Sequence, residues 1–96
     1  MEEIKDLAWF KNVITPTLKG YEVVYRFFEK GDFGSLNQVL FNSSKLGGEV
    51  DFWERDFLSI HLWDYEKNVE LLNVFLEPEE YTEKEKAFEE LQRLLK

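Results

Sequence analysis

The chain has 96 residues and no cysteine, and its 20 acidic and 12 basic side chains give a formal net charge of −8. This length leaves room for one hydrophobic core, so we expect a single domain over residues 1–96, and a hydrophobic fraction of 44% argues against disorder. The negative charge disfavours direct binding to nucleic-acid phosphates or to a membrane surface, and it favours a basic protein partner.

The absence of cysteine excludes a disulfide framework, a thiolate zinc site and a cysteine nucleophile, and it suits a reducing compartment. The first residues lead into no apolar run of signal-peptide length. No later run approaches the roughly 18 apolar residues of a membrane span. We therefore expect a cytoplasmic protein.

The N-terminal part of the chain mixes helical and strand patterns. Residues 2–12 place apolar side chains at helical spacing behind acids that suit a helix N-terminus, which predicts a short amphipathic helix. A Thr-Pro pair follows and predicts the start of a second helix, over residues 16–30. Alternating β-forming side chains within residues 20–28 are also typical of a strand, so that interpretation stays open.

A third helix is predicted over residues 35–46. Ser35, followed three residues later by Gln38, has the form of a capping box, and apolar residues at helical spacing come after it. Gly47 and Gly48 would then end this helix with a left-handed C-cap.

The hydrophobic period changes to two in the second half of the chain. Two alternating runs separated by charged turns, followed by a third apolar run, predict a three-stranded antiparallel β-meander at about 49–77. Thr82 and Glu85 form a capping box ahead of an apolar stripe, which predicts a C-terminal amphipathic helix at about 82–95. The predicted fold class is therefore α+β, with N-terminal helices, a meander and a final helix that covers the sheet.

The charge is unevenly distributed along the chain. Residues 1–48 carry six acidic and six basic side chains, whereas residues 49–96 carry fourteen acidic and six basic ones. The second half therefore holds the whole net charge, and the meander and the final helix are where we expect a cationic partner to bind.

Catalysis and metal binding are the first two functions to weigh. His61 is the only histidine, and it could act as an acid–base catalyst with Ser59 or with nearby carboxylates. Residues i and i+2 on a strand are too far apart for a dependable nucleophile–base hydrogen bond. Carboxylates also surround the first predicted hairpin, namely Glu49, Asp51, Glu54 and Asp56. Their spacing lacks the pattern of a calcium-binding loop, so we expect no enzyme activity, no metal and no cofactor.

A binding surface is the third possibility. If Leu58, Ile60 and Leu62 face the core, the alternate side chains of that strand emerge on the other side of the sheet. Aromatic anchors beside carboxylates suit a basic partner, because rings fill pockets and acids pair with Lys or Arg. The predicted partner-binding residues are Asp51, Trp53, Glu54, Asp56, His61, Trp63, Asp64, Tyr65 and Glu66. The N-terminal helices could instead cover these rings and make the sheet a buried middle layer.

The segment LGGEVDFW from Leu46 to Trp53, continued by Phe57 to Asp64 and the capped final helix, resembles small acidic immunity proteins. These are the cytoplasmic antidotes of contact-dependent and other polymorphic bacterial toxin systems. The likeness covers the second half of the chain and lies in its acidity, its aromatic content and its helices around a meander. It implies a non-enzyme that binds and blocks a toxin domain, often a nuclease. A small enzyme and a self-associating subunit, such as a homodimer that pairs edge strands, stay open as alternatives.

Overall fold

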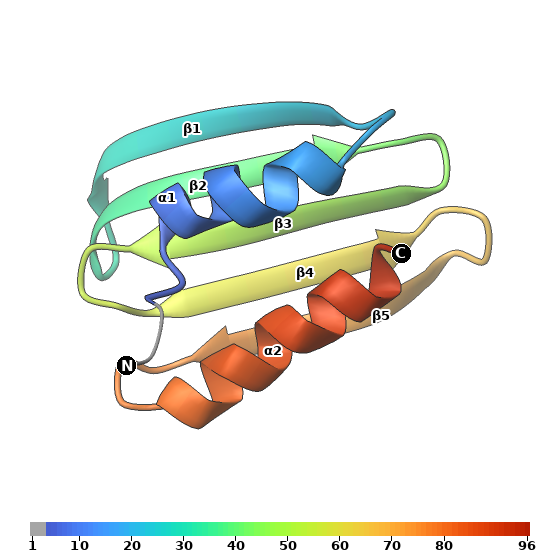
Figure 1. Cartoon of the computed structure of the whole chain (residues 1–96). Helices are drawn as coiled ribbons and strands as arrows, with labels where there is room; N and C mark the ends of the chain where they lie inside the picture. Colours follow the sequence, from blue (N-terminus) through green and yellow to red (C-terminus); the bar gives the residue numbers. More distant parts are fainter. Residues whose placement is uncertain (1–3) are drawn as a thin grey trace.

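A computed structural model of the chain describes residues 4–96. It contains a five-stranded antiparallel sheet, with the strands side by side in chain order and the helices on one face (Figure 1). The elements are α1 (Leu7–Trp9), the π-helical turn η1 (Phe10–Ile14), the 3-10 turn η2 (Thr15–Thr17), β1 (Glu22–Gly31), β2 (Gly34–Asn42), β3 (Leu46–Trp53), β4 (Leu58–Asp64), β5 (Val69–Leu76) and α2 (Tyr81–Leu94). The α+β class is as the sequence predicts, but the sheet has five strands where three were expected.

The expected helices over residues 16–30 and 35–46 are wrong, because these segments form most of β1 and β2. The alternative interpretation of residues 20–28 as a strand is confirmed. The predicted meander at 49–77 is present as β3, β4 and β5, so the missing strands are the two that precede it.

The sequence of strand β2 predicted a helix because the strand carries apolar side chains on both faces. Val39 and Phe41 are fully buried on one face, while Leu36 and Leu40 are half-buried on the other. Apolar residues at 36, 39 and 40 fit a helix as well as a strand. Pairing with β1 on one side and β3 on the other decides the outcome, since tertiary context overrides local propensity.

Gly47 and Gly48 lie inside β3 and do not end a helix, which corrects the C-cap prediction. A Cβ on Gly48 would overlap the ring of Phe41 on the buried face. A Cβ on Gly47 would overlap the hydroxyl of Tyr65 on the opposite face. The two glycines therefore mark close approaches of aromatic side chains to the strand backbone.

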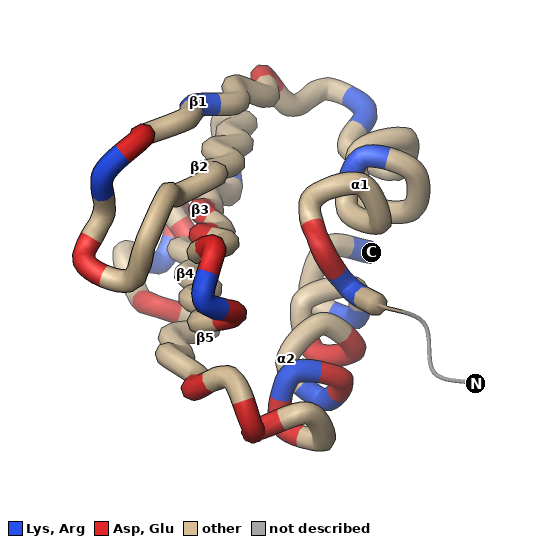
Figure 2. The backbone as a smooth tube through the Cα atoms, turned by 90° about the vertical axis from the view of Figure 1, so that its left-hand side faces the viewer, with Lys and Arg blue, Asp and Glu red and all other residues tan. Residues whose placement is uncertain are grey.

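The core lies between the helices and one face of the sheet, and the two layers are clear from the side (Figure 2). Phe88 of α2 is fully buried, with its ring 4.9 Å from that of Trp9 and 6.2 Å from that of Phe52. Phe10 and Ile14 are also buried, so the N-terminal helical segment and helix α2 together cover this face. No helix within residues 4–96 is long and apolar enough to cross a membrane.

The helix ends differ in detail from the sequence prediction. The first helical segment runs from Leu7 to Thr17, begins with Asp6 accepting a hydrogen bond from the Trp9 amide at 2.9 Å, and takes in the Thr-Pro pair. Residues 2 and 3 of the predicted first helix lie outside the described residues. Helix α2 starts one residue earlier than predicted, without a side-chain cap, so the capping box at Thr82 is wrong.

The sheet turns use residues that tolerate a left-handed backbone. Asp56 in the β3–β4 turn has φ 65° and Asn68 in the β4–β5 turn has φ 56°. Asp and Asn adopt this region more readily than other non-glycine residues. These two tight turns bring β3, β4 and β5 into the register that places the residues described next.

Candidate functional site

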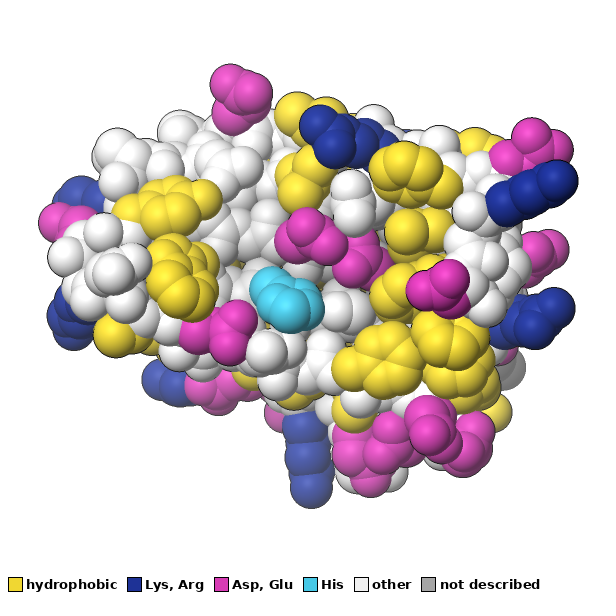
Figure 3. Space-filling model, turned by 180° about the vertical axis from the view of Figure 1, so that it is seen from behind, with side chains coloured by type: hydrophobic (Ala, Val, Ile, Leu, Met, Phe, Trp, Pro, Cys, Tyr) yellow, Lys and Arg dark blue, Asp and Glu magenta, His cyan; other side chains and the backbone are white. Residues whose placement is uncertain are grey.

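The face of the sheet opposite the helices is uncovered, and we call it the open face (Figure 3). Leu58, Ile60 and Leu62 are buried on the helix side of β4, so the alternate residues of that strand lie on the open face. The interpretation in which helices cover these alternate residues is therefore wrong. Strand register places the following side chains on the open face: Gln38, Glu49, Asp51, Trp53, Ser59, His61, Trp63, Glu70, Asn73 and Phe75.

The middle of the open face is polar. The side-chain amide of Gln38 donates to Glu49 Oε2 at 3.2 Å and to Asp51 Oδ1 at 3.0 Å, so it bridges two carboxyl groups of the same strand. Asp51 is only 7% exposed. Burial, together with the hydrogen bond and negative charge of Glu49, raises the pKa of Asp51 to about 7. Asp51 can therefore hold a proton at neutral pH.

His61 borders this carboxyl pair. It lies directly opposite Glu49 in the β3–β4 register, and its Nδ1 is 3.6 Å from Glu70 Oε2 on β5. The imidazole is about half exposed, with a side-chain exposure of 46%. In Figure 3 the histidine lies near the centre of the open face, beside acidic groups.

Aromatic rings lie at one end of this polar centre, and we call them the aromatic cluster: Phe33, Trp53, Phe57 and Phe75. Phe33 stacks on Phe57 with ring centroids 3.9 Å apart, and Phe75 lies between 5.7 and 5.8 Å from the other three rings. Phe75 is nevertheless 49% exposed. The cluster is therefore a packed apolar surface that solvent still reaches.

Two further rings lie at the other end of the open face. Trp63 is 38% exposed and Tyr65 is 47% exposed. The Tyr65 hydroxyl donates to Asn42 Oδ1 at 2.5 Å, which holds the ring over Gly47. A hollow of about 240 Å³ separates these rings from His61 and the carboxylates. The open face thus has an acidic centre with aromatic groups on two sides.

The structure divides the predicted binding residues into two sets. Asp51, Trp53, His61, Trp63 and Tyr65 come together on or beside the open face. The remaining predicted residues lie in the two turns or at the last position of β4, and they accept bonds from backbone amides or are exposed: Glu54, Asp56, Asp64 and Glu66.

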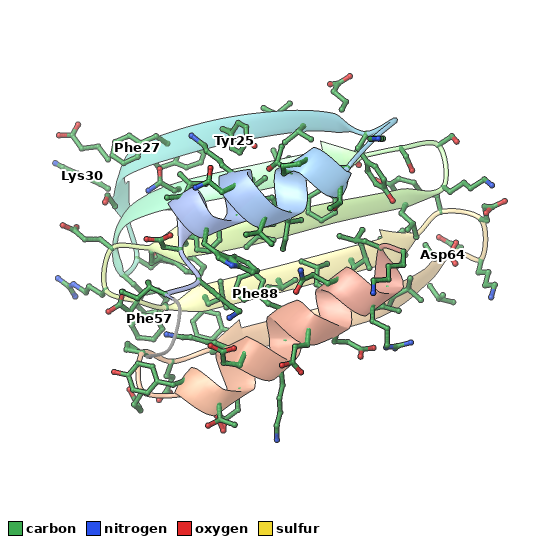
Figure 4. All side chains as sticks on the ribbon, in the orientation of Figure 1. Tyr25, Phe27, Lys30, Phe57, Asp64 and Phe88 are labelled. Atoms are coloured by element: carbon green, nitrogen blue, oxygen red, sulfur yellow. The ribbon has the colours of Figure 1, made fainter. Side chains whose placement is uncertain are left out.

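The turn carboxylates have structural partners. Glu54 Oε1 accepts from the Ser35 amide at 3.1 Å. Asp64 Oδ1 accepts from the amides of Glu66 and Lys67 at 2.9 and 3.0 Å. Phe57 and Asp64 mark opposite ends of β4 in Figure 4, so the two turns lie at opposite ends of the open face. Acids are present at both ends, but those at the centre are the ones brought together.

Sequence reasoning missed several residues of this surface. Gln38 fell within the predicted helix over residues 35–46, and Phe33 fell between two predicted helices, so neither was placed beside the meander. Glu70 and Phe75 lie in a run that is apolar almost throughout, so its sequence does not indicate which side chains lie on which face of the sheet. Strand β2 is apolar on both faces, so its pattern gave no signal that would have placed Gln38 on the open face.

Two other features of the structure are relevant to binding: possible metal ligands and a second hollow. Within residues 4–96, no group of three or more His, Cys, Asp or Glu side chains is placed to hold a metal ion. A larger hollow of about 440 Å³ lies between the N-terminal segment, the β3–β4 turn and the start of α2. Its wall includes Lys5 and Glu85, which pair with each other at 2.8 Å, and Lys84, which donates to the carbonyl of Asp56. These charged groups already have partners.

Comparison with protein-family models, with curated proteins and with solved structures finds no match for this chain.

Proposed function

We propose that this chain is a non-catalytic binding protein whose open face takes a basic protein partner. The observation that carries the proposal is the arrangement of Glu49, Asp51 and Glu70 at the centre of an uncovered sheet face with exposed aromatic rings on two sides. Carboxylates draw in and orient a cationic partner, while rings supply the buried contact that gives affinity.

The surrounding charge supports this direction of binding. The second half of the chain contains fourteen acids and six bases, and it supplies β3, β4, β5 and α2. A cationic protein is therefore attracted at long range, whereas nucleic acid and anionic lipid are repelled.

The particular role that we propose is that of an immunity-like inhibitor. An acidic surface can occupy the basic substrate cleft of a toxin domain, such as a nuclease, and thereby block it. The combination of an acidic, aromatic sheet face and short helices supports this role, together with the resemblance of the segment from Leu46 to Asp64 to such proteins.

Co-expression with the product of the neighbouring gene tests this role. We expect a basic protein that arrests growth when produced alone, is tolerated when this chain is present, and purifies with it in a one-to-one complex. A neighbouring basic protein that binds without loss of toxicity, or the absence of any binding, would contradict the role.

Charge reversals map the contact to the open face. Glu49→Lys and Glu70→Lys should each weaken the complex at least about tenfold, because they place a cation where the partner's cations bind. Glu89→Lys makes the same charge change on the exposed side of α2 and serves as the matched control. Equal weakening by all three variants would show that only net charge matters, and not the open face.

A small acid–base enzyme is the second candidate. Two observations favour it: His61 Nδ1 lies 3.6 Å from Glu70 Oε2, and Asp51, with its pKa of about 7, can exchange a proton near neutral pH. His61→Gln separates the two functions. An enzyme should lose at least about a hundredfold in turnover, whereas an inhibitor should lose no more than about tenfold in affinity.

A further inference from the structure

Strand β1 is an edge of the sheet and pairs only with β2 within the described part of the chain. Residues 22–28 pair without interruption, and the register shifts only after Phe28. Exposed edge strands can add another strand through their free backbone groups. This edge therefore offers seven regular residues for pairing.

The side chains of this edge are unusually apolar for a solvent-exposed strand. Val24, Tyr25, Phe27 and Phe28 are all exposed, and Phe27 reaches 62%. Tyr25 and Phe27 project on the helix side of the strand, as Figure 4 shows (labelled at the top), while Val24 and Phe28 lie on the open face. Both faces of the edge would gain buried apolar area if a second strand were added.

The charges of the regular segment are Glu22 and Arg26, which lie on the same face and are related symmetrically about Val24. Antiparallel pairing of two identical strands about a two-fold axis at Val24 sets each Glu22 opposite Arg26 of the other copy. Opposite charges placed directly across a strand pair stabilise it. Val24 then lies opposite itself, and Val23 lies opposite Tyr25.

We propose that β1 is a homodimer interface in which two copies pair antiparallel about Val24 and form one continuous sheet. The charge pattern favours this register, because the adjacent axis at Tyr25 would set Glu22 opposite Phe28 and Arg26 opposite Val24 and would form no ion pair. An axis at Arg26 would set the two Arg26 side chains opposite each other, and like charges in that position destabilise a strand pair. An axis at Phe27 would set Arg26 opposite Phe28 and leave Glu22 without a partner.

The proposed dimer is compatible with the open face as a binding surface. A two-fold axis perpendicular to the sheet keeps the helices of both copies on one side and both open faces on the other. Each dimer would therefore present two copies of the acidic centre side by side. The inference does not depend on the proposed function, because β1 contributes none of the residues at that centre.

Sedimentation velocity over a range of concentrations tests the proposal. The wild-type chain should show a concentration-dependent dimer. Glu22→Arg and Arg26→Glu should each raise the dimer dissociation constant about tenfold or more, because each sets like charges opposite each other twice in a symmetric pair. The double variant Glu22→Arg with Arg26→Glu should return to within about threefold of the wild type, since it restores both ion pairs.

Glu89→Arg is the matched control, because it reverses an exposed acid on α2 and should leave the dimer unchanged. Circular dichroism on each variant checks that the fold is retained. A wild-type chain that stays monomeric up to about 1 mM, a range that covers weak association, would overturn the proposal. So would a double variant that is as weak as the two single ones, or a dimer that neither single variant affects.

Discussion

On the helix-covered face, Val39, Val50 and Ile60 lie side by side across three strands, and none of them is exposed. One residue away on the open face, Gln38 and Asp51 occupy the equivalent row. The row on the covered face consists of apolar side chains that fill the core. The row on the open face contains the desolvated carboxyl group of Asp51, whose burial opposes folding. The covered face therefore accounts for stability, and the open face carries the chemistry that our proposed function uses.

Removing a large ring from each face gives the strongest test of this division. Phe88→Ala should lower the free energy of unfolding by about 3–5 kcal/mol, because it empties a fully buried position between Trp9 and Phe52. Phe75→Ala on the open face should cost no more than about 1.5 kcal/mol, since the ring is half exposed. Urea denaturation measures both, and equal losses would erase the distinction between the faces.

Gly48→Ala probes the close approach of Phe41 to β3. The added methyl group would overlap the buried ring, so the ring or the strand must shift, and we expect a loss of about 1–3 kcal/mol. Ser44→Ala in the exposed β2–β3 turn is a suitable control and should change stability by less than about 0.5 kcal/mol. The same denaturation measurement applies, and a neutral Gly48→Ala would mean that the ring can move without cost.

The open face should add a pH dependence that the covered face lacks. The pKa of Asp51 is raised from 3.8 to about 7 on folding, so the folded chain holds a proton that the unfolded chain releases. The corresponding stabilisation is fully present below about pH 4 and is lost as the pH rises through 7. This group should therefore remove roughly 2–3 kcal/mol of stability between pH 5 and pH 8.

Asp51→Asn tests this directly, because the amide mimics the protonated carboxyl and can keep the hydrogen bond from Gln38. The variant should be more stable than the wild type at pH 8 and should show a flatter pH dependence. Denaturation midpoints at several pH values give the comparison. An unchanged pH profile would mean that Asp51 does not titrate near neutrality.

Tyr65→Phe should have the smallest effect. It removes the hydroxyl that donates to Asn42 on the exposed end of the open face, and the expected loss is about 0.5–1 kcal/mol. Asn42→Ala should cost a similar amount and add little in the double variant, since both remove the same bond. A clearly larger loss would mean that the bond between the Tyr65 hydroxyl and Asn42 contributes more than an exposed hydrogen bond normally does.

The sequence was most informative where one face of a strand is polar. The residues from Leu58 to Trp63 alternate cleanly, so β4 was predicted correctly, and α2 was predicted from its single apolar stripe. The sequence left open which face of β4 is uncovered. Helices were predicted over β1 and β2, with a strand left open only for residues 20–28, because apolar side chains occupy both faces of these strands and satisfy the helical and the strand period together. Their assignment depends on pairing across the sheet, which local sequence does not encode.

The same limit applies to the candidate site. Asp51, His61 and Trp63 were predicted on one surface because they lie in the meander. Gln38, which links Glu49 to Asp51, comes from a strand that the sequence did not reveal. The raised pKa of Asp51 depends on burial by neighbouring strands, so no pattern within β3 alone could have predicted it.

The most direct measurement is amide chemical-shift mapping of the isotope-labelled chain in complex with the basic protein encoded beside it. If the open face is the binding surface, the largest changes should fall on β3, β4 and β5 around Glu49, His61 and Glu70, with the buried helix face little affected. Changes confined to the exposed acids of α2, or to the hollow beside Lys5, would contradict this assignment of the binding surface.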